Sequence, residues 1–171
     1  MDGAWLVARL IIGLGLAAHG TQKLLGWFGG YGFKGTAGFF ESIGFRPGTL
    51  FALAAGLGEV GGGLLTATGL FGPIGPSLII TVMVVAIVAV HLPNGFFAQA
   101  NGYELPLVYA VVALLFAVLG PGTYSLDALL GLSGMWHPTV DWFVAGGAVV
   151  IGLANVALRR RVTEPMVTAQ R

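Results

Sequence analysis

A few polar side chains able to do chemistry interrupt long apolar stretches of this chain. His19 and Lys23 are four residues apart and would share one face of a helix. Glu59 lies in an apolar run that gives no local reason for a carboxyl group. An ionisable group at membrane depth costs from about 2.5 to more than 10 kcal/mol, so it is kept where it faces a cavity, a ligand or another such group. The candidate site residues are His19, Lys23, Glu59, His91, Asn94 and Glu104.

Each of these residue types suggests a chemical task. We expect Glu59 and His91 to be the catalytic pair that relays protons. Lys23 would hold or polarise an anionic or carbonyl group, and His19 would orient the ligand. Two structural alternatives stay open. Glu59 could be a neutral acid that donates a hydrogen bond across helices, and Lys23 could extend its ammonium to the interface.

The remaining candidates lie near the predicted ends of helices. Asn94 follows His91 in the segment HLPNGFF, where Pro93 would stop a helix. Glu104 opens an apolar run and could cap that helix or contribute to a substrate-binding rim. We assign both Asn94 and Glu104 to substrate binding.

Several cofactors could fit a cluster with two histidines. Haem ligation by two histidines and a metal site both require that His19 and His91 lie at the same depth in the membrane. A metal site also needs a third protein ligand, and none is evident, so we assign no metal. A quinone needs only a hydrogen-bond donor or two beside an apolar groove. We therefore favour quinone over haem. The chain has no cysteine, which removes thiolate metal sites and iron–sulfur clusters.

Composition places the chain in the lipid bilayer. Hydrophobic residues make up 56% of it, charged residues 9%, and the mean hydropathy is +0.88. The net charge is +1, and apart from Arg159, Arg160 and Arg161 the basic residues are scattered. Nothing resembles the basic face that phosphate backbones require, which argues against nucleic acid as a partner.

Hydropathy predicts an all-α bundle of transmembrane helices. The segment 26–48 is too polar to span, although residues 37–43 could form a short amphipathic helix on the membrane surface. Pro73 and Pro76 mark a tight turn between two spans. The predicted spans cover residues 5–25, 50–71, 77–92, 105–119 and 142–158.

Alternation of the first four spans would gather the candidate residues at one end of the bundle. Glu59, about nine residues into its span, would lie roughly 13 Å below the rim and form the floor of a cavity. Basic residues around the first loop and after the last span favour an outer amino terminus and a cytoplasmic carboxyl terminus, although Arg9 opposes this.

Glycine is frequent within the spans, with 29 residues in the chain. Gly58 and Gly62 form a GxxxG pair, which predicts a central second span with close helix contacts and is compatible with a homo-oligomer. Gly56, Gly58 and Gly61 also spell GxGxxG. The surrounding run is an apolar helix, so the strand that a dinucleotide site requires is absent from the pattern.

The chain resembles the DoxX family of small bacterial membrane proteins. The resemblance rests on HGTQKLLGWFGG from His19, GTAGFFESIGF from Gly35 and GLGEVGGGLL from Gly56. It continues in VHLPNGFF, NGYELPL and GPGTYSLDALL. It implies a four-helix membrane domain over residues 1–132. We expect a fifth helix and a basic tail, at residues 133–171, to follow this domain. It also implies a location in the bacterial cytoplasmic membrane and a broad assignment as an oxidoreductase component.

Three functions remain open from the sequence. The first is a membrane subunit of a redox system that binds quinone or a small sulfur-containing substrate, because a related branch of the family resembles the membrane subunit of thiosulfate:quinone oxidoreductase. The second is a non-catalytic scaffold that docks soluble redox enzymes through the aromatic first loop and the basic tail. The third is a transporter for a small solute. Whether the chain is itself an enzyme stays open.

Overall fold

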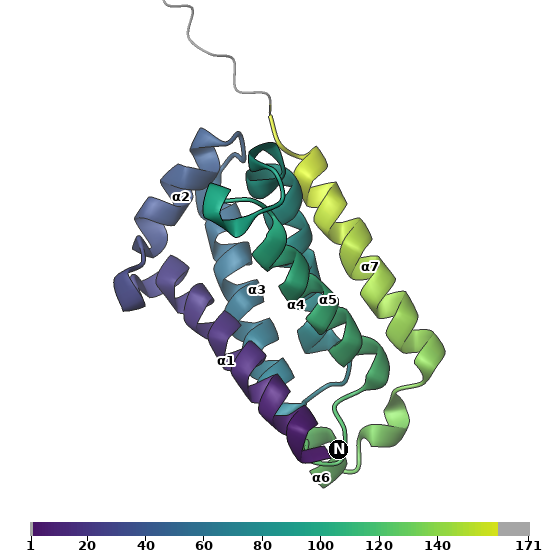
Figure 1. The fold of residues 1–171 in the computed structure, drawn as a ribbon. Helices are drawn as coiled ribbons and strands as arrows, with labels where there is room; N and C mark the ends of the chain where they lie inside the picture. The colour runs from purple at the N-terminus through teal and green to yellow at the C-terminus, as the bar shows by residue number, and fades with distance from the viewer. Residues whose placement is uncertain (1, 161–171) are drawn as a thin grey trace, which may run out of the picture.

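Long apolar runs with no proline in their central turns form the main helices of the bundle (Figure 1). The computed structural model describes residues 2–160. Within them, seven α-helices and no strands occur, which confirms the all-α prediction. The predicted contacts of the tail at residues 161–171 lie outside the described residues. The five longest bundle helices are α1 (Asp2–Leu25), α3 (Gly48–Thr68), α4 (Ile74–Ala86), α5 (Glu104–Leu119) and α7 (Pro138–Ala157).

Four helical segments in the described residues are long and apolar enough to cross a membrane. They are α1, α3, α7 and the segment Ile74–Asn94, in which a π-helical turn (Ile87–His91) continues α4. The fourth expected span, residues 105–119, corresponds to α5, which is apolar but has only 16 residues, about 24 Å of helix. Since a hydrocarbon core is about 30 Å thick, we expect α5 to be accommodated by local thinning of the bilayer.

The surface helix is longer than expected from the sequence. Helix α2 covers Gly32–Ser42, whereas the sequence predicted residues 37–43. It begins earlier because Gly32 adopts the left-handed conformation (φ 65°), which turns the chain into the helix. In Figure 1 α2 lies at the upper end of the bundle, beside the carboxyl end of α1. Short 3₁₀ turns occur at Trp27–Gly29, Leu92–Asn94, Ala98–Ala100 and Ser133–Met135.

Helix α3 contacts α1, α2 and α4, as expected for a central helix. Glycines bring its backbone close to both neighbouring spans. A Cβ on Gly13 of α1 would lie 2.5 Å from the Gly63 carbonyl oxygen, and one on Gly62 would lie 2.9 Å from the Gly75 carbonyl oxygen of α4. The predicted GxxxG pair of Gly58 and Gly62 therefore faces α4 of the same chain.

At the end of the bundle away from α2, two buried charged residues hold neighbouring segments together. Asp127, in the short helix α6 (Leu126–Leu129), accepts hydrogen bonds from the backbone N–H groups of Phe71 (2.8 Å) and Gly72 (2.7 Å). Arg9 is 1% exposed and donates to the carbonyl oxygens of Thr66 (3.4 Å) and Tyr124. These contacts join α1, the α3–α4 turn and the α5–α6 loop.

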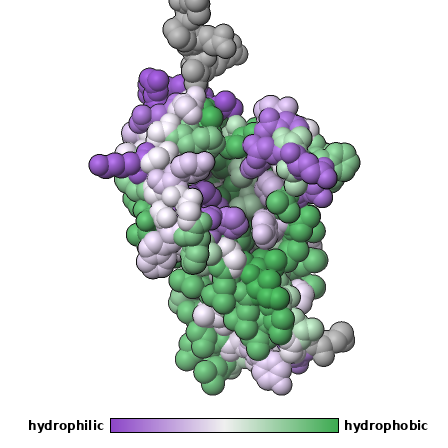
Figure 2. All heavy atoms as spheres, turned by 60° about the vertical axis from the view of Figure 1, so that its left-hand side comes forward, coloured by the Kyte–Doolittle hydropathy of each residue, from purple (hydrophilic) through white to green (hydrophobic). Residues whose placement is uncertain are grey.

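The outer surface of the spans is apolar. Figure 2 shows a broad hydrophobic region over the body of the molecule and hydrophilic residues gathered near one end. Helix α1 contributes Ile11 and Leu14, and α7 contributes Phe143 and Val150, all more than half exposed. In a membrane protein these side chains face the lipid.

Candidate functional site

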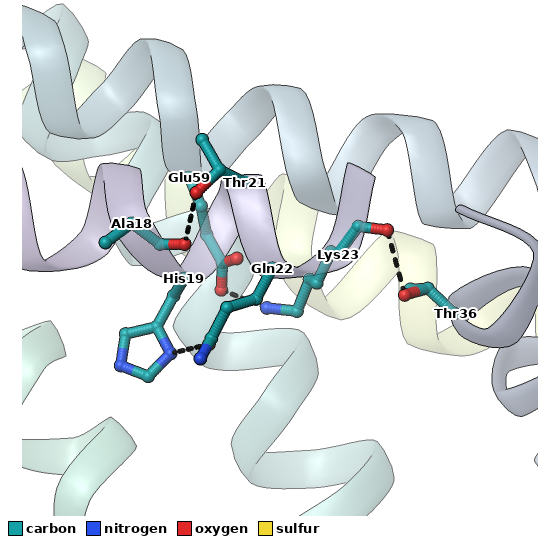
Figure 3. A network of polar contacts seen from close by, with 7 residues as sticks. All are labelled: Ala18, His19, Thr21, Gln22, Lys23, Thr36 and Glu59. Atoms are coloured by element: carbon teal, nitrogen blue, oxygen red, sulfur yellow. Dashed lines mark hydrogen bonds and ion pairs between the residues drawn. The ribbon is translucent and has the colours of Figure 1, made fainter. Parts of the chain in front are cut away.

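The central feature of the site is an ion pair between α1 and α3. The Lys23 ammonium donates to Glu59 Oε1, as Figure 3 shows. The Glu59 side chain is 3% exposed, whereas that of Lys23 is 33% exposed. Glu59 Oε2 is buried and has no hydrogen-bond partner among the described residues. The carboxyl group is therefore enclosed by the helices, and its cation reaches it from a more open position.

His19 does not join this pair. Its Nδ1 lies 3.0 Å from Oε1 of Gln22, one turn further along α1, and its ring is exposed (Figure 3). Gln22 in turn donates to the carbonyl oxygen of Phe28 (3.2 Å). His19 thus belongs to a surface network at the end of α1.

A partly open cavity of about 530 Å³ lies beside Lys23 and is lined by residues of α1, α2, α3, the α4 segment and α7. This volume is within the usual range of small-molecule sites. A recess near the hydrophilic end is visible in Figure 2. Most of the lining side chains are apolar. The polar ones are Lys23, Tyr31, Thr36, Thr81, His91, Asn101 and Asn155.

His91 lines this cavity from the π-helical turn that ends the α4 segment. Its Nδ1 lies 2.8 Å from the backbone carbonyl oxygen of Asn101. Because a carbonyl oxygen can only accept, Nδ1 carries the proton, and Nε2 of the neutral ring is left as a proton acceptor. Asn101 adopts a left-handed conformation (φ 60°), which asparagine tolerates better than most residues.

The two remaining candidates stabilise the loop beside His91. Asn94 is exposed and donates to the carbonyl oxygens of Val90 (3.3 Å) and Asn101 (3.2 Å). Glu104, the first residue of α5, accepts a hydrogen bond from the backbone N–H of Ala98 (2.8 Å). Neither side chain is among those that line the cavity.

The structure therefore brings together part of the predicted constellation. Lys23 and His91 line one cavity, and Glu59 reaches it through Lys23. His19, Asn94 and Glu104 do not line it. Sequence reasoning missed the polar wall residues Thr81 and Asn155. It also assigned no site role to the aromatic residues of the cavity lining, Tyr31, Phe39 and Phe40.

A signal for two of the missed residues was present in the sequence. Thr81 and Asn155 are polar residues within otherwise apolar spans, as Glu59 is.

Within residues 2–160, no group of three or more histidine, cysteine, aspartate or glutamate residues is arranged to hold a metal ion.

Comparison with known proteins gives a family match over the first part of the chain. The model of the DoxX family matches residues 4–92, just over half of the chain, from α1 to the end of the π-helical turn. An uncharacterized protein of Haemophilus influenzae is 36% identical over 67 residues, which is 39% of this chain and 42% of that protein. The match thus spans less than half of this relative's length. No solved structure matches the chain.

Proposed function

Because the chain belongs to the DoxX family of membrane proteins, we propose that it is an integral membrane subunit of a redox system and that it binds a quinone in the cavity beside Lys23. We place it in the cytoplasmic membrane of a bacterium, with a soluble redox enzyme as its partner. The observation that carries the proposal is the cavity itself, which joins an apolar wall to an internal ion pair and a histidine.

The charge balance of the cavity favours a quinone over a small sulfur oxyanion. The positive charge of Lys23 is already neutralised by Glu59. A small anion would have to enter an apolar site and compete with a buried carboxylate for the same ammonium, which is unfavourable. A neutral quinone carbonyl can bind without displacing Glu59 from the ammonium. It can accept a second hydrogen bond from the ammonium, which has three N–H donors, while Glu59 keeps the first.

The proposed proton chemistry uses His91 and Glu59 differently. Reduction of a quinone consumes two electrons, which a soluble redox partner would supply, and two protons. Both protons would come from water, and His91, which lines the cavity, can take up a proton at Nε2 and pass it to the ligand. Glu59 would act through Lys23, because its carboxyl group does not line the cavity. Glu59 is thus a positioning residue in this proposal.

Ligand binding to purified protein in lipid nanodiscs tests the proposal. Replacing Lys23→Met removes the donor, and we expect the affinity for a short-chain benzoquinone to fall about 10-fold, as for loss of a hydrogen bond from a charged group. Lys34→Met is the matched control, because Lys34 is exposed on α2 and does not line the cavity. Unaltered binding in Lys23→Met, or no binding above that of empty nanodiscs, would contradict the proposal.

A further inference from the structure

Helix α7 contributes Asn155 to the cavity lining, although α7 lies outside the segment that the family model matches. It packs on α4 through small residues that recur on one face: Ala145, Ala148 and Gly152 are all buried. A Cβ on Gly152 would lie 2.8 Å from Cβ of Val84, so the two helices are in close contact there. Thr81 of α4 donates to the Ala148 carbonyl oxygen (3.1 Å) and adds a polar contact between them.

The next residue on this face of α7 is Asn155, three positions after Gly152, and it lines the cavity. Its amide nitrogen donates to the Ile151 carbonyl oxygen (2.9 Å). A carbonyl can only accept, so this hydrogen bond fixes which end of the amide is nitrogen. The other end, Oδ1, is a hydrogen-bond acceptor.

Other polar groups of the cavity lining also offer acceptors. The hydroxyl protons of Thr36 and Thr81 are donated to backbone carbonyl oxygens, at 3.0 Å from Thr36 to that of Lys23 and at 3.1 Å from Thr81 to that of Ala148. The donor of the ion pair, Lys23, comes from α1, whereas Asn155 comes from α7. The cavity therefore has a cationic donor from one helix and a neutral acceptor from another.

We propose that Asn155 Oδ1 accepts a hydrogen bond from a hydroxyl group of the ligand, so that α7 helps the cavity to distinguish a hydroquinone from its quinone. This inference rests on the proposed quinone site. A quinone carries only carbonyl acceptors, which gain nothing from an acceptor in the wall. Its reduced form carries two hydroxyl donors, one of which can pair with Asn155.

The test compares both forms of one ligand in wild-type protein and in Asn155→Leu, again in nanodiscs. Leucine has nearly the same shape and retains the apolar packing of α7. We expect the affinity for a short-chain hydroquinone, measured by titration calorimetry under nitrogen, to fall about 5-fold, as for loss of one neutral hydrogen bond. The affinity for the matching benzoquinone should change less than about 2-fold. Leu153→Ala is the control on α7, because Leu153 is half exposed toward lipid.

Each outcome bears on a different statement. A selective loss of hydroquinone binding supports the role of Asn155, and intact benzoquinone binding in the same variant shows that the cavity is still folded. An equal loss of both ligands would mean that Asn155 acts through packing, and no loss of either would mean that it makes no contact; both results overturn the inference and leave the quinone site standing. Wild-type protein that binds neither ligand would overturn the proposed function as well.

Discussion

At the scale of single residues, the Lys23–Glu59 pair controls the electrostatics of the cavity. Glu59 is almost fully enclosed, and its Oε2 atom has no partner in the described residues. A buried carboxylate needs its cation, since an unpaired charge in a low-dielectric environment is strongly unfavourable. Lys23 is less dependent on the pair, because a third of its side chain is exposed.

This asymmetry predicts the outcome of a double-mutant cycle. Lys23→Met leaves a buried carboxyl group without its cation, and we expect a loss of stability of about 2 kcal/mol, below the value for fully buried pairs because Lys23 is partly solvated. Glu59→Gln should cost less. The double variant should be more stable than Lys23→Met alone, as measured by thermal unfolding in detergent. Additive effects of the two substitutions would show that the pair does not stabilise the fold.

The sequence predicted some of these residues and not others. Lys23 and Glu59 could be found because each is a charged residue close to or within an apolar run, where a charge is rarely kept without a partner or a cavity. Asn155 is also polar and lies in a span. Its position in the cavity lining depends on the register in which α7 packs on α4, and tertiary contacts determine that register. His19 shares a helix face with Lys23 but does not line the cavity, since four-residue spacing defines a shared face and not what that face contacts.

At the scale of helices, a close crossing of α1 and α3 holds the ion pair in place. Gly13 and Gly63 meet backbone to backbone, and Gly20 approaches the backbone of Gly56 one to two turns nearer to the site. Lys23 follows Gly20 by three residues, as Glu59 follows Gly56. The glycine contacts therefore keep α1 and α3 close enough for the Lys23 ammonium to reach the Glu59 carboxylate.

Larger residues at this crossing should separate the two helices. We expect Gly13→Val to destabilise the protein by about 1 to 3 kcal/mol, the usual cost of overpacking, and to weaken ligand binding as well. Gly15→Val is the control on the same helix, because a Cβ there meets nothing within 4 Å. Thermal unfolding of the two variants in the same detergent measures the difference. Equal melting temperatures for both variants would count against a tight α1–α3 crossing.

The helices themselves were largely predictable, and their ends less so. All five expected spans correspond to observed helices, since apolar runs of this length leave the backbone few other ways to satisfy its polar groups in lipid. The third begins at Ile74, three residues before the predicted start, because Pro76 fits in the first turn of a helix. The π-helical turn at Ile87–His91 had no signature in hydropathy.

At the scale of the whole molecule, the two ends differ in charge. Lys34 and Arg46 are exposed near the end that holds the cavity, and Arg159 and Arg160 follow α7 there. The backbone N–H of Arg160 donates to the Gly44 carbonyl oxygen at 2.9 Å, which places the end of α7 beside the α2–α3 loop. Arg9 opposed the predicted orientation, but it is a buried structural residue and does not act as a loop charge.

The orientation can be tested by cysteine labelling, because the chain has no cysteine of its own. Lys34→Cys on α2 and Thr123→Cys in the α5–α6 loop place single thiols in exposed positions. Helices α2 and α6 lie near opposite ends of the bundle (Figure 1). With the amino terminus outside, a membrane-impermeant maleimide added to intact cells should label the Thr123→Cys variant and leave the Lys34→Cys variant unlabelled until the cells are lysed. The reverse labelling pattern would invert the topology and place the cavity on the outer side.

The contacts of Arg9 have a consequence for biosynthesis. Arg9 lies in α1, yet one of its carbonyl partners belongs to Tyr124, which is synthesised more than a hundred residues later. Until that loop is synthesised, the guanidinium group must be solvated by water, by lipid headgroups or by the translocation machinery. Arg9 therefore has both of its carbonyl partners, those of Thr66 and Tyr124, only after the α5–α6 loop has been made.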